Sequence, residues 1–303
     1  MEIPNLTNLE AEASNESTSP QRLQELVRTS PELARWVAAN SSAPSELLRE
    51  LSENEDAIVR EAVTGNPNTP TEILLELAGE FPEGFLDNPI LPLLCIERPD
   101  FINTIPIQTA VSLLQSERAP TAWLVQASVD LLRSLGANEN TPVAFLQKLA
   151  NHENSFIRAG VAKNPQTPVV ILETLVSDED REVRRWIAKH RQMSETELEK
   201  LASDEDSSVR LEIAKNARTP TAALEKLAGD CDREVRRWVA EHHQTSESVL
   251  AQLANDKNQY VRAAVAGNLT TPTLVFKKLA NDETRPVRLA VARNWHRYQL
   301  SEN

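Results

Sequence analysis

The chain repeats one sequence pattern every 26 residues between Thr141 and Arg297. Leucine and arginine return at this interval in two separate columns: Leu149, Leu175, Leu201, Leu227, Leu253 and Leu279, and Arg158, Arg184, Arg210, Arg236, Arg262 and Arg288. A fixed period of this size is typical of stacked structural repeats, in which each repeat buries its apolar face against its neighbours. The period therefore favours a repeat architecture over a globule with one central core.

Each repeat contains two short helical patterns separated by an acidic turn. In the repeat that begins with Thr167 and Pro168, we expect the threonine hydroxyl to cap the first helix and the proline to take its first position. The next repeat lacks the proline but has Ser194 and Glu197 at capping-box spacing. Helices of about ten residues are unstable alone in water, so they must be stabilised by stacking. We therefore predict an all-α fold, a right-handed α-solenoid of about 26-residue two-helix repeats interrupted by a non-repeat helical segment.

A column of asparagines and histidines follows the second helix of each repeat. Its members are Asn164, His190, Asn216, His242, Asn268 and Asn294. Both residue types tolerate the left-handed backbone that commonly ends a helix, so we interpret the column as a row of helix stops. A metal site shared by His190, His242 and His243 is excluded, because helices pack ~8–10 Å apart and two repeats separate the first histidine from the others.

The pattern divides the chain into four predicted parts. They are a disordered acidic tail at 1–17, N-terminal repeats at 18–80, an irregular or inserted helical segment at 81–140 and a six-repeat solenoid at 141–303. We expect the repeats to form one continuous elongated body. The third part contains two helical patterns, Ile107–Glu117 and Thr121–Leu135. We favour a degraded pair of repeats over an insertion that kinks the solenoid or forms its own docking surface.

Charge is distributed unevenly along the chain, whose formal net charge is −13 at pH 7. Residues 1–140 contain 8 Lys and Arg against 22 Asp and Glu, whereas residues 141–303 contain 24 against 23. The acidic half disfavours nucleic acid and anionic membranes as partners, while the second half is compatible with a local basic strip. The sequence shows no signal-peptide pattern and no apolar run of membrane-spanning length, so we expect a cytoplasmic protein that does not enter membranes.

One repeat illustrates a pattern that is found in a known family. Its positions are Asn164-Pro165-Gln166-Thr167-Pro168, Leu172, Leu175, Asp178, Val183-Arg184 and Ile187-Ala188. The pattern resembles the leucine-rich repeat variant family and, more broadly, HEAT-type helical repeats, over about Ser19–Phe85 and from Thr141 to the end. This resemblance implies a curved superhelix of paired short helices. One founding member of the family is associated with an iron–sulfur cluster on a cysteine-rich segment, but this chain has only Cys95 and Cys231, so we expect no cofactor.

Aspartates and arginines recur six positions apart in the repeats. The pairs are Asp178/Arg184, Asp204/Arg210, Asp230/Arg236, Asp256/Arg262 and Asp282/Arg288. The resemblance to HEAT-type repeats implies that such pairs form a ladder between neighbouring repeats. We interpret these arginines as structural rather than anion-binding, because the acid built into each repeat would neutralise them first.

Two repeats share the segment DREVRRW, at residues 180–186 and 232–238. The candidate residues for partner binding are Arg35, Trp36, Arg185, Trp186, Arg237 and Trp238. The tryptophan column otherwise holds Gly160, Glu212, Ala264 and Ala290, a mixture that we do not expect in a deep core. At ~100° per residue, Trp186 lies beside the apolar stripe of its helix and Arg185 points outward. We favour a tryptophan that lies over the next repeat with arginine stacked on it, and we keep open an Arg/Trp strip that grips a partner.

The sequence contains no catalytic signature. It lacks a nucleophile–base motif, an HExxH motif and a glycine-rich phosphate loop. We therefore predict that the protein is not an enzyme but a non-catalytic scaffold that binds another protein or an extended peptide along the solenoid surface.

Two other functions and one mode of assembly stay open. A HEAT-like nucleic-acid-binding protein or DNA glycosylase-like enzyme would contact the phosphate backbone through Arg185, Lys189, Arg191 and Arg237. An assembly factor for a cofactor-bearing protein is a second alternative. The last repeat has no evident capping helix, which leaves end-to-end self-association open.

Overall fold

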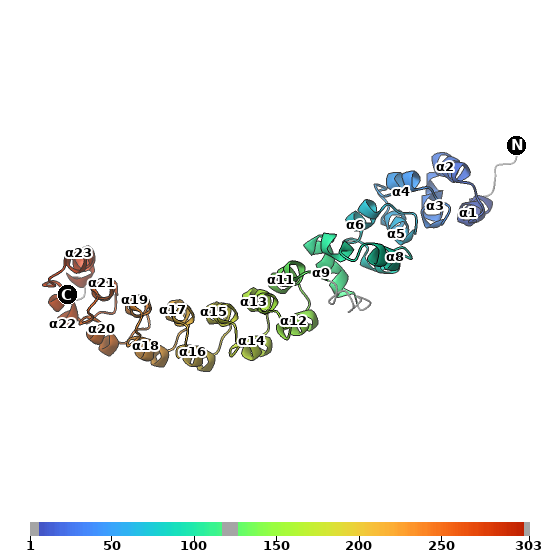
Figure 1. Ribbon diagram of the computed structural model, residues 1–303. Helices are drawn as coiled ribbons and strands as arrows, with labels where there is room; N and C mark the ends of the chain where they lie inside the picture. Colours follow the sequence, from blue (N-terminus) through green and yellow to red (C-terminus); the bar gives the residue numbers. More distant parts are fainter. Residues whose placement is uncertain (1–5, 117–126, 300–303) are drawn as a thin grey trace. The chain divides into compact units, whose positions relative to one another are not determined.

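The computed structural model describes residues 6–116 and 127–299, except for the side chains of residues 296–299 (Figure 1). Within these ranges the regular secondary structure is entirely helical. The predicted all-α class of paired helical repeats is confirmed. The chain divides into two compact units, Met1–Phe145 and Leu146–Asn303.

The first unit is built from short helices. They are α1 (Leu6–Ser14), α2 (Pro20–Thr29), η1 (Pro31–Leu33), α3 (Ala34–Ala39), α4 (Ser45–Leu51), α5 (Ala57–Gly65), α6 (Thr71–Leu77), α7 (Pro82–Leu86), α8 (Leu91–Glu97), η2 (Phe101–Thr104), α9 (Ile107–Gln115) and α11 (Val129–Ala137), where η denotes a 3-10 helix. The prediction of a disordered tail at 1–17 is wrong for Leu6–Ser14. That segment is ordered because Ala13 is fully buried in the apolar core and Leu9 packs against it.

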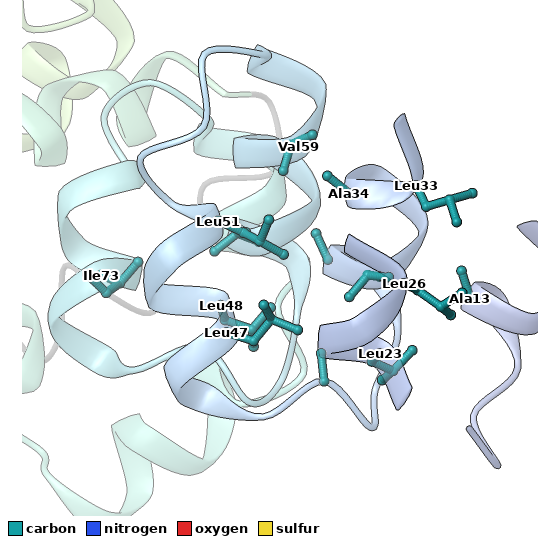
Figure 2. Close-up of a cluster of buried hydrophobic side chains, with 14 of the residues drawn as sticks. Ala13, Leu23, Leu26, Leu33, Ala34, Leu47, Leu48, Leu51, Val59 and Ile73 are labelled. Atoms are coloured by element: carbon teal, nitrogen blue, oxygen red, sulfur yellow. The ribbon is translucent and has the colours of Figure 1, made fainter. Parts of the chain in front are cut away.

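Helices α1 to α6 share one apolar core (Figure 2). Leu23 and Leu26 of α2 and Leu48 of α4 are buried almost completely, and they pack in one cluster with Val37 and Val63 of the second helices. No single helix pair could enclose these side chains by itself, because each pair contributes only one apolar face. The repeats are therefore stable only as neighbours.

The segment after α6 keeps part of the repeat plan. Helix α7 is followed by Asn88, whose side-chain amide donates to the backbone oxygens of Thr64 (2.8 Å) and Asn66 (2.9 Å). The predicted helix Ile107–Glu117 corresponds to α9. The predicted continuous helix Thr121–Leu135 is wrong at residues 127–128, which are not helical, because Ser128 caps the start of α11. The earlier part of that prediction lies outside the described residues.

The second unit alternates first and second helices. After α12 (Val143–Ala150), which contains the division between the units, they are α13 (Ser155–Lys163), α14 (Val169–Leu175), α15 (Arg181–Lys189), α16 (Glu195–Leu201), α17 (Ser207–Lys215), α18 (Thr221–Leu227), α19 (Arg233–Glu241), α20 (Glu247–Leu253), α21 (Gln259–Gly267), α22 (Thr273–Leu279) and α23 (Arg285–Gln299). Within this unit the second helices, α13 to α23 with odd numbers, pack on one another along the inner side of a curve. The first helices, α14 to α22 with even numbers, lie along the outer side (Figure 1).

The residues at the start of each first helix show how it is joined to the preceding repeat. The threonine before the proline does not cap the first helix as predicted: the Thr167 hydroxyl instead donates to the backbone oxygen of Val161 at 2.7 Å. The proline itself occupies the cap position and offers no side-chain hydrogen bond. Thr167 is fully buried, so its hydroxyl is stabilised only by an internal acceptor, and a carbonyl in the last turn of α13 supplies it. The predicted cap at Ser194 is confirmed, because its hydroxyl accepts from the N–H of Glu197.

The asparagine column is not a row of left-handed helix stops. Asn216 has φ −71° and ψ 118°, and no described residue has a positive φ. Its side-chain amide donates to the backbone oxygens of Ala188 (2.8 Å) and His190 (3.5 Å) in the preceding repeat, and its side-chain oxygen accepts from the N–H of Arg218. We call this set of contacts the asparagine ladder. It comprises Asn40, Asn66 and Asn88 in the first unit and His190, Asn216, His242, Asn268 and Asn294 in the second.

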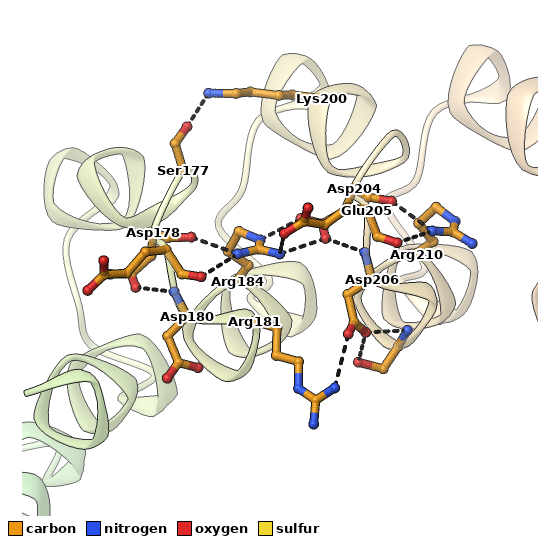
Figure 3. Close-up of polar contacts among 12 residues, drawn as sticks. Ser177, Asp178, Asp180, Arg181, Arg184, Lys200, Asp204, Glu205, Asp206 and Arg210 are labelled. Atoms are coloured by element: carbon orange, nitrogen blue, oxygen red, sulfur yellow. Dashed lines mark hydrogen bonds and ion pairs between the residues drawn. The ribbon is translucent and has the colours of Figure 1, made fainter.

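A ladder of arginine–aspartate contacts between neighbouring repeats is confirmed, but the carboxylate that pairs with each arginine lies 20 positions after it and not six positions before it (Figure 3). Arg184 donates to both carboxylate oxygens of Asp204 in the next repeat, at 2.6 and 3.0 Å. Its remaining guanidinium nitrogen donates to the backbone oxygens of Asp178 and Glu179 in its own repeat. The same geometry joins Arg158 to Asp178, Arg210 to Asp230, Arg236 to Asp256 and Arg262 to Asp282. These arginines are therefore occupied within the fold and are not available to an external anion.

Candidate functional site

The predicted partner-binding residues of the second unit lie on α15 and α19. In α15 the apolar residues Val183 and Ile187 are fully buried. At ~100° per residue, Glu182, Arg185 and Lys189 lie on the side of that helix away from the core, and Trp186 lies on the flank next to them. We call this side of each second helix, with its flank, the inner stripe, because the second helices line the inner side of the unit (Figure 1). The inner stripe is one of the surfaces that the fold leaves to solvent.

Trp186 is half-buried between two lysines. The side-chain nitrogen of Lys189 lies 4.6 Å from the centroid of the indole ring, and that of Lys163 lies 5.4 Å from it. Lys163 belongs to the preceding repeat, whereas we expected the tryptophan to lie over the next one. A depression of about 330 Å³ follows this contact and is lined by Ala162, Lys163, Pro165, Trp186, Lys189, His190, Arg191 and Gln192. An aromatic wall and three cationic side chains therefore share one hollow.

Arg185 does not point freely outward as predicted. Its side chain is 37% exposed, and its Nε lies 3.3 Å from a carboxylate oxygen of Glu212 in the next repeat. The same oxygen lies 3.5 Å from Lys189 and 3.9 Å from Lys215. Glu212 is buried, and the three surrounding cations stabilise its carboxylate there. Glu212 belongs to the tryptophan column, which we did not expect to lie in the core, so that expectation is wrong at this position.

The second copy of the segment has a different charge arrangement. Trp238 lies beside Lys215 (5.4 Å to the ring centroid) and Arg237 (5.7 Å). Arg237 also lies 3.2 Å from a carboxylate oxygen of Glu234. Where α15 ends in Lys189, α19 ends in Glu241. The two tryptophans thus have the same position in their repeats, but only the first is flanked by lysines from both helices.

The remaining candidates belong to the first unit. The guanidinium of Arg35 stacks on Trp36 at 4.6 Å from the ring centroid and lies 3.9 Å from a carboxylate oxygen of Glu10. Trp36 packs against the apolar core of that unit. This pair fits the interpretation of a tryptophan covered by a stacked arginine. The structure therefore gives Arg35 and Trp36 a packing role within the first unit.

Several surface residues of the inner stripe were not among the predicted partner-binding residues, and of these only Lys189 was named above, for the nucleic-acid alternative. Phe156 on α13 and Tyr260 on α21 are 62% and 54% exposed, although aromatic side chains of this size are usually covered. Lys163, Lys189 and Lys215 are the last residues of three consecutive second helices. Their common 26-residue spacing is visible in the sequence and could have marked them as a column.

Across residues 6–116 and 127–299, no group of three or more His, Cys, Asp and Glu could hold a metal ion. In the part of the chain that the structure describes, no helix combines the length and the apolar composition needed to cross a membrane.

Residues 7–66 match the family model of the Leucine Rich Repeat Variant domain. Among solved structures, the chain is similar to "a leucine-rich repeat variant with a novel repetitive protein structural motif", with 22% identity, a TM-score of 0.50 and coverage of 79% of this chain and 87% of that chain. It also aligns with the crystal structure of an engineered protein at 15% identity and a TM-score of 0.34, covering 96% of this chain and 93% of that one. No curated protein matches the chain. The resemblance to leucine-rich repeat variants is confirmed, and the structural likeness shows the fold.

Proposed function

We propose that the protein is a non-catalytic scaffold whose second unit binds an extended peptide, or an extended segment of another protein, along the inner stripe. The observation that carries this proposal is the set of aromatic side chains on four of the second helices, α13, α15, α19 and α21; α17, which lies between α15 and α19, has none. Phe156 and Tyr260 are exposed, and Trp186 and Trp238 are half-buried between them. The matching family model describes a repeat domain, which supports a scaffold rather than a catalytic role.

These aromatic residues are not required by the core. The interior of each repeat is already filled by aliphatic side chains such as Val183, Ile187 and Leu198, all fully buried. Aromatic and arginine side chains dominate the binding energy of protein interfaces, and large exposed apolar groups often mark such surfaces. A partner that covered the inner stripe would bury aromatic area without disturbing the ladders between repeats. We therefore assign binding to the inner stripe and not to the asparagine and arginine–aspartate ladders that join the repeats.

The proposal is tested with a displayed library of unstructured 12-residue peptides selected on the full-length chain. We expect selected peptides to bind wild-type protein and to bind the double variant Trp186→Ala/Trp238→Ala at least tenfold more weakly, while the helical circular-dichroism signal stays unchanged. The loss is expected because two aromatic contacts leave the binding surface.

A matched control removes apolar area from the opposite side of the unit. Val170 on α14 and Leu274 on α22 are 70% and 81% exposed on first helices, so Val170→Ala/Leu274→Ala should leave peptide binding unchanged. Failure to select any peptide would contradict the proposal. Equal binding by the tryptophan double variant and the wild type would contradict the assignment to the inner stripe.

A further inference from the structure

The structure points to the chemistry of the partner through three lysines on the inner stripe. Lys163, Lys189 and Lys215 end α13, α15 and α17, and all three are exposed. We call these residues the lysine row. The arginines that hold the repeats together are buried beside aspartates, so the lysine row is a separate set of cations on a separate surface.

The cations along this row are only partly compensated. Lys189, Lys215 and Arg185 lie within 3.9 Å of the same carboxylate oxygen of Glu212. Arg185 also lies 3.5 Å from a carboxylate oxygen of Glu182, so two carboxylates, one of them buried, face these three cations. Arg191 adds a further cation to the hollow that also contains Lys163, Trp186 and Lys189. The positive charge at this surface therefore favours an anionic ligand.

The spacing of the lysine row indicates which backbone conformation an anionic peptide would need in order to contact successive lysines. Packed helices lie ~8–10 Å apart, so the backbone positions of neighbouring lysines are separated by about one such step, while the side chains of Lys189 and Lys215 converge on Glu212. A polyproline II chain rises ~3.1 Å per residue and has three residues per turn. Every third side chain of such a chain therefore points in the same direction, ~9 Å further on, and can meet the next lysine. A β-strand would turn every third side chain to the opposite face, because its side chains alternate.

We propose that the lysine row binds an extended acidic peptide that carries a carboxylate at every third residue, with the face of Trp186 packing against the peptide between two of these carboxylates. This inference rests on the proposed peptide-binding function and specifies its partner. Glu182 and Glu234 occupy the first turns of α15 and α19 on the same stripe, and Glu241 replaces lysine at the end of α19. These carboxylates would repel a continuous phosphodiester backbone, so the arrangement favours a peptide with separated charges over a nucleic acid.

The test uses three fluorescein-labelled 12-residue peptides and one single-stranded oligonucleotide, titrated by fluorescence anisotropy into the full-length chain. The first peptide repeats Glu-Pro-Ser four times; the second has the same composition with its four glutamates adjacent; the third has lysine in place of glutamate. We expect the first peptide to bind at least tenfold more tightly than the other two. Raising the salt concentration from 50 to 200 mM should weaken this binding, because the contacts are between exposed charges.

Two matched triple variants locate the binding. Lys163→Ala/Lys189→Ala/Lys215→Ala removes the row, whereas Lys200→Ala/Lys226→Ala/Lys278→Ala removes the same charge from the exposed first helices α16, α18 and α22. We expect the first variant to bind the spaced peptide at least tenfold more weakly and the second to bind it as the wild type does, with equal helical signals.

Three results would overturn the inference. They are equal affinity for the spaced and the adjacent glutamates, unchanged affinity in the lysine-row variant, and a row-dependent affinity for the oligonucleotide that exceeds that for the spaced peptide. Library selection of peptides without spaced acidic residues would refute this inference but would leave the proposed function intact. Selection of no peptide at all would refute the proposed function itself.

Discussion

The two units join their repeats with different sets of polar contacts. Both have the asparagine ladder, in which a side-chain amide donates to backbone oxygens of the preceding repeat. Among the residues that the structure describes, only the second unit has a run of nearly buried arginine–aspartate pairs, with side chains 5–13% exposed. In the first unit the corresponding pair is Arg60 with Glu80, and the Glu80 side chain is 49% exposed.

This difference follows from the kind of acceptor that each side chain needs. An asparagine binds backbone atoms, which any residue supplies, so the ladder continues from Asn66 to Asn88 even though that repeat is shortened. The arginine fork requires a carboxylate at one offset, 20 residues further along the chain, in every described pair. The Arg60–Glu80 pair of the first unit keeps that offset, but its acid is a glutamate that is 49% exposed rather than a nearly buried aspartate. The asparagine ladder is therefore the general contact between repeats, and the buried arginine–aspartate ladder is an addition that depends on an aspartate at that offset.

The largest predicted effect is the loss of one arginine from the second unit. Arg236→Ala leaves the carboxylate of Asp256 buried without its cation, and we expect it to lower the free energy of unfolding by about 3–5 kcal/mol. Arg60→Ala, at the exposed pair of the first unit, should cost about 1 kcal/mol or less. Urea unfolding with local hydrogen exchange measures both. Equal losses would contradict the distinction between the units.

The asparagine ladder should have the same importance in both units. Asn66→Ala and Asn216→Ala each remove a donor to two backbone oxygens and an acceptor for one N–H, and we expect each to cost about 2–3 kcal/mol. Asn255→Ala, at an exposed position on the outer side, is the matched control and should change stability by less than about 0.5 kcal/mol. A negligible effect of Asn66→Ala would show that the asparagine ladder does not stabilise the first unit.

The smallest predicted effect depends on pH and concerns one residue of the asparagine ladder, His242. His242 Nε2 lies 3.0 Å from the backbone oxygen of Asn216, while its Nδ1 accepts from the N–H of Gln244, so the neutral ring fits the site. Burial lowers the pKa of His242 below its usual value of 6.5, partly offset by the hydrogen bond to Asn216 and assisted by the neighbouring His243. As the pH falls below 6.5, the unfolded chain takes up the proton first, and stability therefore decreases.

The variant His242→Asn separates this effect from general acid sensitivity. An asparagine can make the same two contacts without titrating, as Asn216 does in the preceding repeat. We expect the melting temperature of the variant to fall less than that of the wild type between pH 8 and pH 5.5. An identical decrease in both proteins would assign the pH dependence to other groups.

The sequence predicted the repeat fold because the apolar columns and their period are properties of each repeat by itself. The role of Asn216 could not be predicted in the same way. Its acceptors are backbone oxygens of the preceding repeat, which any residue type can supply, so no particular residue is required at the partner position. Arg184 was assigned to a ladder because its acid also forms a column. The surroundings of Trp186 were missed, because Lys163 reaches it from a different repeat. The irregular segment lost its period, so its helix boundaries were predicted only in part.

The most direct test of peptide binding at the lysine row is hydrogen exchange of the full-length chain with and without the spaced acidic peptide. The account predicts that the peptide slows exchange in the last turns of α13, α15 and α17, where Lys163, Lys189 and Lys215 lie. Protection confined to the first helices α14, α16 and α18, or to the first unit, would contradict binding on the inner stripe.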